Sequence, residues 1–342
     1  MLFPDTPVIS NVVEFFDWGK ESSFIPEGNE TPKTHKVQGI FYRILSQEQK
    51  AIGHLLGVVH VANKEVLYLN EPIREAVKKA DSIYLEIVPG KMPDIDLLKD
   101  LEEPQREKLE KFVQLAFPRL ILKLLESGAS FEGLSEINYI FNEAGFDSAK
   151  KLGLVSMLLE QLIVYRAKIV CAPGQDLSST GPPLGIDRLL VSYAREVNKQ
   201  LRSLEDGQER LGSIKQALLG ADRINYLPSN EQEVESHIEK NCNCVIDSCN
   251  AWIDGDEDCI KKIFTSNREE DSNFYTEINT KRNIAMANKI DEVLHSQEEG
   301  KIPFFAVGSI HVLDEEESIV GLLREKGWTV ERVMNREEIA VG

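Results

Sequence analysis

The sequence predicts an α/β fold with a central mixed, mostly parallel sheet built from two related halves, with a large helical insertion between them. The main observation is a repeat. A glycine stands three residues before a histidine at residues 57–60 and again at residues 308–311, each time within an apolar run. Each copy is followed by an acidic loop, a helical stretch and a second strand-like run, which is the order of a strand–helix–strand unit. Residues 89–300, between the copies, carry mainly helical patterns.

The first half covers residues 37–88. Strands are predicted at residues 39–45 and 51–61, joined by a polar turn. The second of these strands is apolar on both faces, which is typical of buried central strands in parallel sheets. A helix at residues 73–80 and a strand at residues 82–88 complete this half.

The insertion covers residues 89–300. Pro104 opens a long amphipathic helix, and Pro118 inside it is expected to kink or split that helix. Ser229 and Gln232 form a predicted capping box for a later helix. The other predicted elements are helices at residues 134–144, 150–169, 185–198, 232–252 and 273–296, and a short strand at residues 199–205.

The second half covers residues 301–335 and repeats the order of the first. A strand at residues 304–312 is followed by a helix at residues 318–327 and a strand at residues 329–334. No flexible linker bounds the insertion, so we expect one domain of residues 1–342.

Two histidines mark the ends of equivalent strands. Histidine is scarce, with 6 in the chain, and His60 and His311 occupy the same position in the two copies. Ligands of open α/β sheets bind beyond the carboxyl ends of the strands. We therefore expect both imidazoles in one cleft on neighbouring strands, although 311 − 60 = 251 residues separate them. The glycine before each histidine removes a side chain where another part of the protein approaches the backbone.

Two glutamates are expected near these histidines. Glu86 lies in the strand after the first repeat's helix and should stand beside His60 on an adjoining parallel strand. Glu205 ends the short strand of the insertion. A carboxylate within an apolar strand is costly unless it is paired, protonated or bound to a metal. The alternative is that both carboxylates leave the sheet into a solvated loop, as we expect for Glu331 with its neighbour Arg332.

An arginine falls on the apolar face of the last long helix. Arg282 is spaced four residues from Ile278 and four from Met286. It must pair with an acid, reach into a cleft, or extend its head into water. Asn283 adds an amide that can orient a ligand or a carboxylate.

The composition of the chain excludes some classes of binding partner and indicates a cellular location. The net charge of −18 argues against nucleic acid or an anionic membrane surface, and no apolar run is long enough for a membrane span. The start of the chain lacks a signal-peptide pattern, and the five cysteines are an odd count, which favours reduced thiols and a cytoplasmic location. Export without a cleavable signal is the alternative. A peptide or small-molecule substrate fits, and the oligomeric state is left open.

The chain resembles the TraB/PrgY/GumN family, which includes the TIKI-type metalloproteases. The resemblance covers most of the chain and includes the segments GVVHV, LRSLEDGQERL, AWIDGDEDCIKKIF, TKRNIAMANKI and FFAVGSIHVLDEEESIVGLLREKGWTVERV. It implies a fold similar to haem-binding ChaN-like and erythromycin-esterase-like proteins. It also implies that the site positions of the family are filled by His60, Glu86, Glu205, Arg282, Asn283 and His311.

The leading hypothesis is a metal-dependent hydrolase of peptide bonds. His60, Glu86 and His311, with Glu205 as an optional further ligand, would hold one divalent cation, Mn²⁺, Co²⁺ or Zn²⁺. Either Glu86 or Glu205 would act as the general base rather than as a ligand. The ion would activate water and polarise the carbonyl. The pair Arg282 and Asn283 would stabilise the oxyanion or hold a substrate carboxylate. The alternatives are a metal-free His/Glu hydrolase of esters or amides, and a non-enzymatic protein that sequesters a peptide or haem.

Overall fold

The structure is a computed structural model that describes residues 37–59, 69–88, 102–127, 166, 185–219, 224–270 and 272–334. The chain divides into two compact units. The described residues of the first unit are 102–127, 166, 211–219 and 224–243. Those of the second, which contains the sheet, are 37–59, 69–88, 185–210, 244–270 and 272–334. Parts of the predicted insertion therefore belong to the sheet unit.

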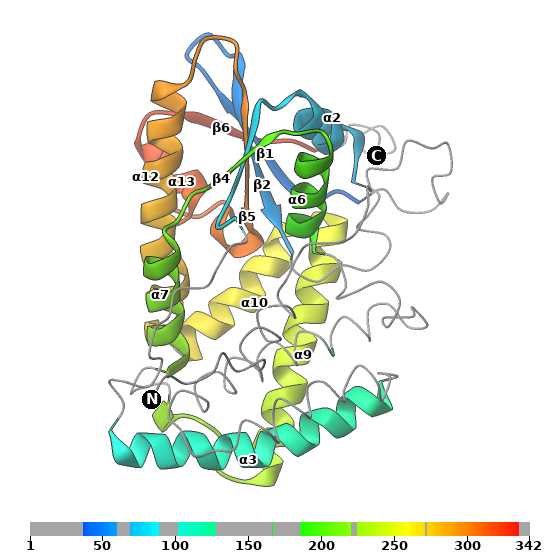
Figure 1. Cartoon of the computed structure of the whole chain (residues 1–342), viewed down its shortest axis with the longest axis vertical. Coiled ribbons are helices and arrows are strands. Elements are labelled where there is room, and N and C mark those ends of the chain that lie inside the picture. Colours follow the sequence, from blue (N-terminus) through cyan, green and yellow to red (C-terminus); the bar gives the residue numbers. More distant parts are fainter. Residues whose placement is uncertain are drawn as a thin grey trace, which may run out of the picture. The chain divides into compact units, whose positions relative to one another are not determined.

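Six strands form one mixed sheet in the order β4-β3-β5-β2-β1-β6 (Figure 1). The strands are β1 (Ile40–Leu45), β2 (Ala51–Val58), β3 (Ser82–Leu85), β4 (Gln200–Ser203), β5 (Pro303–Gly308) and β6 (Thr329–Arg332). The four strands β4, β3, β5 and β2 run parallel, whereas β1 is antiparallel to both of its neighbours. The predicted α/β fold with a mixed, mostly parallel sheet is confirmed.

The two halves interleave at the centre of the sheet. Strand β5 pairs with β2 on one side, where Val58 stands opposite Gly308, and with β3 on the other. The strands that lead toward the two histidines are therefore neighbours, as predicted. The expectation that the strand of Glu86 adjoins that of His60 is wrong, because β5, whose six residues are all buried, takes the central place between β2 and β3. His60 itself lies outside the described residues.

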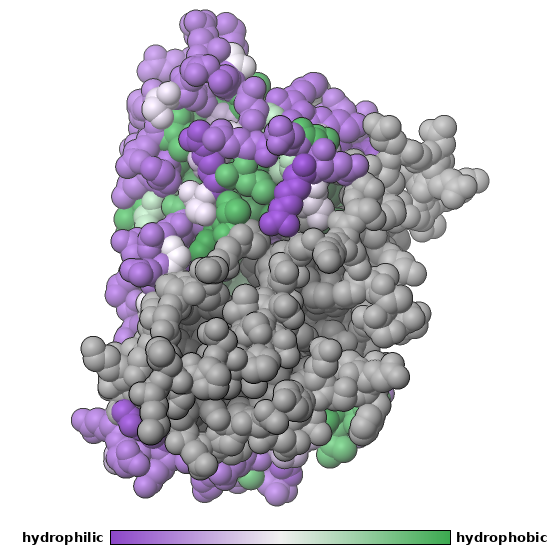
Figure 2. Space-filling view, viewed as in Figure 1, coloured by the Kyte–Doolittle hydropathy of each residue, from purple (hydrophilic) through white to green (hydrophobic). Residues whose placement is uncertain are grey.

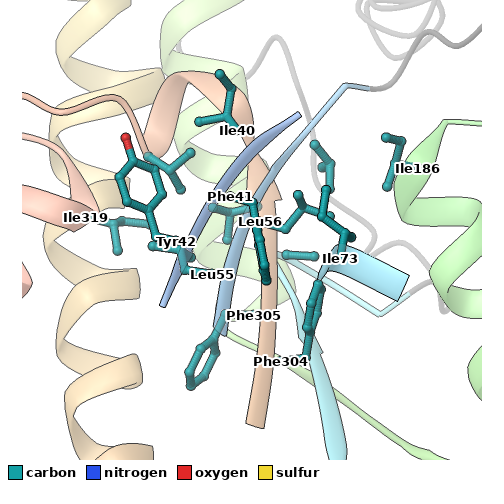
Figure 3. Packing of buried hydrophobic residues seen from close by; sticks show 14 of the residues in the cluster. Ile40, Phe41, Tyr42, Leu55, Leu56, Ile73, Ile186, Phe304, Phe305 and Ile319 are labelled. Atoms are coloured by element: carbon teal, nitrogen blue, oxygen red, sulfur yellow. The ribbon is translucent and has the colours of Figure 1, made fainter. Parts of the chain in front are cut away.

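Helices of the sheet unit pack on both faces of the sheet. Figure 1 shows α12 and α13 on one side and α2 and α6 on the other. Tyr42 and Ile319 lie on the first side, while Ile73, Ile186 and Phe304 lie on the second (Figure 3). The bounds are α2 (Glu71–Lys79), α6 (Ile186–Glu196), α10 (Glu257–Glu270), α11 (Ser272–Tyr275), η2 (Thr276–Thr280), α12 (Lys281–Ser296), η3 (Ser309–His311) and α13 (Ile319–Glu325).

Three further helices lie wholly or partly in the other unit: α3 (Glu103–Glu126), α7 (Gly207–Leu219) and α9 (Glu231–Asp254). Helix α3 is not split at Pro118, contrary to one predicted outcome. A proline removes one helical hydrogen bond, and the buried stripe around it, including Phe117 and Leu120, holds the helix together. The predicted capping box of α9 is wrong by one residue, because the side chain of Asn230 accepts the hydrogen bond from the Glu233 amide at 3.0 Å.

The predicted helix from Asn273 to Ser296 is interrupted by a π-helical turn, η2. Periodicity does not reveal such a turn, because one extra residue hardly changes the pattern of apolar positions. Among the helices that the structure describes, none is long and apolar enough to cross a membrane. The surface around α12 is mainly hydrophilic on the face shown in Figure 2.

Candidate active site

Two buried glutamates lie side by side at the carboxyl ends of β3 and β4. Leu85 pairs with Ser203 at the ends of these parallel strands. The ladder continues beyond them, because the Glu205 amide donates to the Glu86 carbonyl oxygen at 2.9 Å. The side chains of Glu86 and Glu205 are 7% and 5% exposed, so neither carboxylate turns into a solvated loop. Each must be compensated inside the protein.

Arg282 compensates both carboxylates. Its Nε and Nη2 donate to the two carboxylate oxygens of Glu205 at 2.8 Å and 2.6 Å, a bidentate pair. The same Nη2 lies 2.6 Å from Oε2 of Glu86. Burial alone would lower the pKa of Arg282, but the hydrogen bonds and negative charge of the two glutamates outweigh burial and raise the pKa above its usual range. Of the three predicted fates for this arginine, pairing with acids is the one observed.

A second arginine, Arg210, joins the cluster and was not predicted. It lies in the first turn of α7, with Nη1 3.2 Å from Oε2 of Glu86 and 4.0 Å from Oε2 of Glu205. Two carboxylates and two guanidinium groups give a formal charge of −2 + 2 = 0. Arg210 lies five positions after Glu205, and the start of α7 at Gly207 turns the chain back so that its side chain reaches the glutamates.

His311 is positioned by Asn283. The histidine lies in η3, directly after β5, and is 2% exposed. Asn283 Nδ2 donates to the carbonyl oxygen of Glu317 at 2.8 Å, so its Oδ1 faces His311 Nδ1 at 2.7 Å. An amide oxygen only accepts, so Nδ1 carries a proton and Nε2 is the nitrogen that can bind a proton or a metal. That Nε2 lies 3.7 Å from Oε1 of Glu86.

Both polar atoms of the Asn283 side chain are therefore hydrogen-bonded, Nδ2 to Glu317 and Oδ1 to His311. The sequence suggested that Asn283 orients a ligand or a carboxylate, whereas in the structure it orients the histidine. Asn283 is 0% exposed, which fits a positioning residue.

Backbone groups complete the arrangement. The amide of Gly308, at the end of β5, donates to Oε1 of Glu86 at 2.5 Å. A Cβ added to Gly57 would lie 2.5 Å from Cγ2 of Val312 and 3.0 Å from Cα of Ser309. The first glycine of the repeat therefore accommodates the turn that carries His311, and the predicted close approach is confirmed at this position.

The structure brings five of the six predicted site residues into one cluster: Glu86, Glu205, Arg282, Asn283 and His311. The sixth, His60, lies outside the described residues. Within the described part of the chain, no group of three or more His, Cys, Asp or Glu side chains could hold a metal ion. Glu331 is 46% exposed and pairs with Arg43 at 3.3 Å, as expected for a solvated carboxylate.

The fold and the site together define an α/β protein with a buried Glu–Arg–His cluster at the carboxyl edge of its sheet. The model of the TraB/PrgY/gumN family matches residues 40–332, and the chain belongs to this family. The match includes every residue of the cluster. No curated protein and no solved structure matches the chain.

Proposed function

We propose that this protein is a metal-dependent hydrolase of peptide bonds that works at the Glu86–His311 site. The observation that supports this most directly is the placement of His311 Nε2 3.7 Å from a carboxylate oxygen of Glu86, with Nδ1 tied to Asn283. A basic nitrogen and a buried carboxylate that face each other can bind, activate and deprotonate one water molecule. The odd cysteine count favours a cytoplasmic location for this activity.

Two residues of the cluster are suitable ligands for a divalent ion such as Mn²⁺, Co²⁺ or Zn²⁺. His311 Nε2 and Glu86 Oε1 are suitable donors, and His60 would supply the third. Metal-bound histidines usually donate their other N–H to a fixed acceptor, and Asn283 Oδ1 is such an acceptor. When bound, the ion would make its water more acidic and polarise the scissile carbonyl.

Each remaining residue has a proposed role. Glu86, held by the Gly308 amide, would act as a metal ligand beside His311, which leaves Glu205 as the general base that takes the proton from the attacking water. Glu205 would fix Arg282 through the bidentate pair. The guanidinium groups of Arg282 and Arg210 would stabilise negative charge that develops on the substrate carbonyl.

A second candidate is a metal-free hydrolase of esters or amides, with His311 as the general base. The observation that favours it is the charge balance of the cluster, where two arginines already neutralise both glutamates. A bound divalent cation would add two positive charges beside both guanidinium groups and would be repelled by them. In this scheme Asn283 would hold the imidazole in its active tautomer, as the orienting residue of a catalytic triad does.

One experiment separates these candidates: metal analysis of the purified wild type and of the His60→Ala and His311→Ala variants, together with hydrolysis of a peptide pool before and after chelation. About one equivalent of metal in the wild type, lost from both variants together with activity, would support the metallohydrolase. Chelator-resistant hydrolysis without bound metal would support the histidine base. Glu331→Gln is the matched control, because Glu331 lies at the surface. If the wild type contains no bound metal and cleaves no peptide, the remaining interpretation is a non-enzymatic protein that sequesters its ligand.

A further inference from the structure

Asn279 is a buried polar residue whose side chain is not satisfied within the protein. It lies in the π-helical turn η2 and is 2% exposed. Its Oδ1 is buried and has no hydrogen-bond partner. More than nine in ten buried polar groups are hydrogen-bonded in folded proteins, so an unbonded amide oxygen needs a specific reason.

Its position on the helix links this amide to the active site. Residues Asn279, Arg282, Asn283 and Met286 are all buried and follow the three- and four-residue spacing of one helix face. Arg282 and Asn283 contact Glu86 and His311 at the carboxyl edge of the sheet. Asn279 stands one turn earlier, about 4.5 Å along the axis. Because Asn279 is buried and precedes Arg282 and Asn283 by three and four positions, we infer that it lies next to the site, at the carboxyl edge of the sheet where ligands of such sheets bind.

The π-helical turn is itself tied to the site. Lys281 closes it by donating its backbone N–H to the carbonyl oxygen of Thr276. Arg282 Nη1 donates to the carbonyl oxygen of Ile278 at 3.2 Å, within the same turn. Single π turns inside α-helices are frequent at functional sites. Here the turn carries the unsatisfied amide.

We propose that Asn279 is a substrate-binding residue whose amide oxygen accepts a hydrogen bond from a backbone N–H of the bound substrate. This inference rests on the proposed hydrolase function and adds a residue that would determine its specificity for peptide backbones. A peptide supplies N–H donors along its backbone, whereas an ester-linked or N-methylated backbone lacks them. A buried acceptor left unpaired penalises any ligand without the donor, so it selects peptides over such analogues.

The test uses a pool of fluorescent hexapeptides and the same pool with N-methylated backbones, measured for binding and for cleavage. The variants are Asn279→Leu, which keeps the size but removes the acceptor, and Thr280→Val as a control. Thr280 contacts Glu317 at the surface, and its side chain is not part of the site.

We expect the wild type to bind the unmodified pool at least about tenfold more tightly than the N-methylated pool, the size of one well-placed hydrogen bond. Asn279→Leu should remove most of that preference, and Thr280→Val should keep it. The melting temperature of Asn279→Leu should be equal to or higher than that of the wild type, because an unpaired buried polar group is lost.

Equal binding of the two pools by the wild type, no binding of either, or an unchanged preference in Asn279→Leu would overturn the inference. A large fall in the melting temperature of that variant would do so as well, since it would show a structural role. If binding depends on Asn279 but neither pool is cleaved, the hydrolase function fails while the recognition of peptide N–H groups stands.

Discussion

At the scale of single residues, two buried glutamates on neighbouring strands would repel one another without Arg282. Its guanidinium group contacts both carboxylates, and Arg210 adds a second positive charge. The sequence shows that Glu86, Glu205 and Arg282 are unusual, because each is a charged residue on an apolar element. It does not show that they meet, because their contact depends on the pairing of β3 with β4 and on the position of α12.

Replacing Arg282 by methionine should destabilise the protein strongly. The variant leaves two carboxylates buried together without their main partner, and breaking a buried ion pair costs about 3–5 kcal/mol. Urea unfolding measures this loss. The control is Arg43→Met, which breaks the exposed pair with Glu331 and should cost about 0–1 kcal/mol. Equal losses in the two variants would contradict the structural role of Arg282.

Replacing Asn283 should affect the histidine more than the fold. Asn283→Asp keeps an acceptor for His311 Nδ1, whereas Asn283→Leu removes it. We expect Asn283→Leu to lower kcat by about 10- to 100-fold, the usual effect of losing such an orienting partner, and Asn283→Asp to lower it less. Nitrogen NMR of the His311 ring reports the tautomer directly. A wild-type tautomer in Asn283→Leu would refute this role.

Replacing His54 should change how stability depends on pH. Burial, followed by the positive charges of Arg43 and Lys79, lowers the pKa of His54 from 6.5 to about 4. Between pH 6.5 and pH 4, His54 is therefore protonated in the unfolded chain but neutral in the folded protein. The free energy of unfolding falls as the pH drops through this range, by up to about 3 kcal/mol. His54→Phe keeps the stacking with Phe41 and should flatten this fall in urea unfolding between pH 7 and pH 4.5.

The control for that series is His295→Gln, because His295 is 67% exposed. Its stability should follow the wild-type curve between the same two pH values. A slope in His54→Phe as steep as that of the wild type would show that other groups cause the acid sensitivity.

At the scale of elements, the two glycine–histidine repeats are not independent. The glycine in β2, Gly57, makes room for the turn after β5 that carries His311. Its carbonyl oxygen also accepts a hydrogen bond from the Trp252 indole at 2.5 Å. The sequence predicted that something approaches this glycine. Its partner is a residue of the other repeat, Val312, and only the pairing of β2 with β5 reveals that contact.

Gly57→Ala should therefore disturb the site through the fold. The new methyl group would meet Val312 and the backbone of Ser309, so the turn must shift, at a cost of about 1–3 kcal/mol and with loss of activity. Gly53→Ala in the same strand is the control. Its methyl group would lie 3.1 Å from the flexible end of Leu294, which can move aside. Urea unfolding and kcat of the two variants test the difference, and equal effects would contradict the contact.

At the scale of the whole molecule, the class of fold was predictable and the strand order was not. Apolar runs and helical spacing identify the strands and helices, because these patterns are local. The order β4-β3-β5-β2-β1-β6 depends on contacts between distant segments, so the central place of β5 and the contribution of β4 to the sheet could not be read from the pattern. Arg210 was missed for the same reason, since its spacing marks an ordinary helix.

The net charge of −18 should make stability depend on salt. Repulsion between like charges acts over about 10 Å at 0.1 M salt and is screened further as salt is added. We expect the melting temperature to rise by a few degrees, roughly 2–5 °C, between 20 mM and 300 mM sodium chloride. Calorimetric scans in the two buffers give the answer. A constant or falling melting temperature would show that the acidic residues are already compensated.

The central position of β5 has a consequence for how the protein is made. Strand β5 begins at Pro303, which is 303 − 85 = 218 residues after the end of β3 at Leu85. At about 5–20 residues per second, the ribosome needs roughly 10–45 seconds to bridge that interval. During this interval the edges of β2 and β3 that will later pair with β5 have no partner strand. The nascent chain therefore exposes two unpaired strand edges during this interval, and Glu86 and His311 can come together only after β5 has been synthesised.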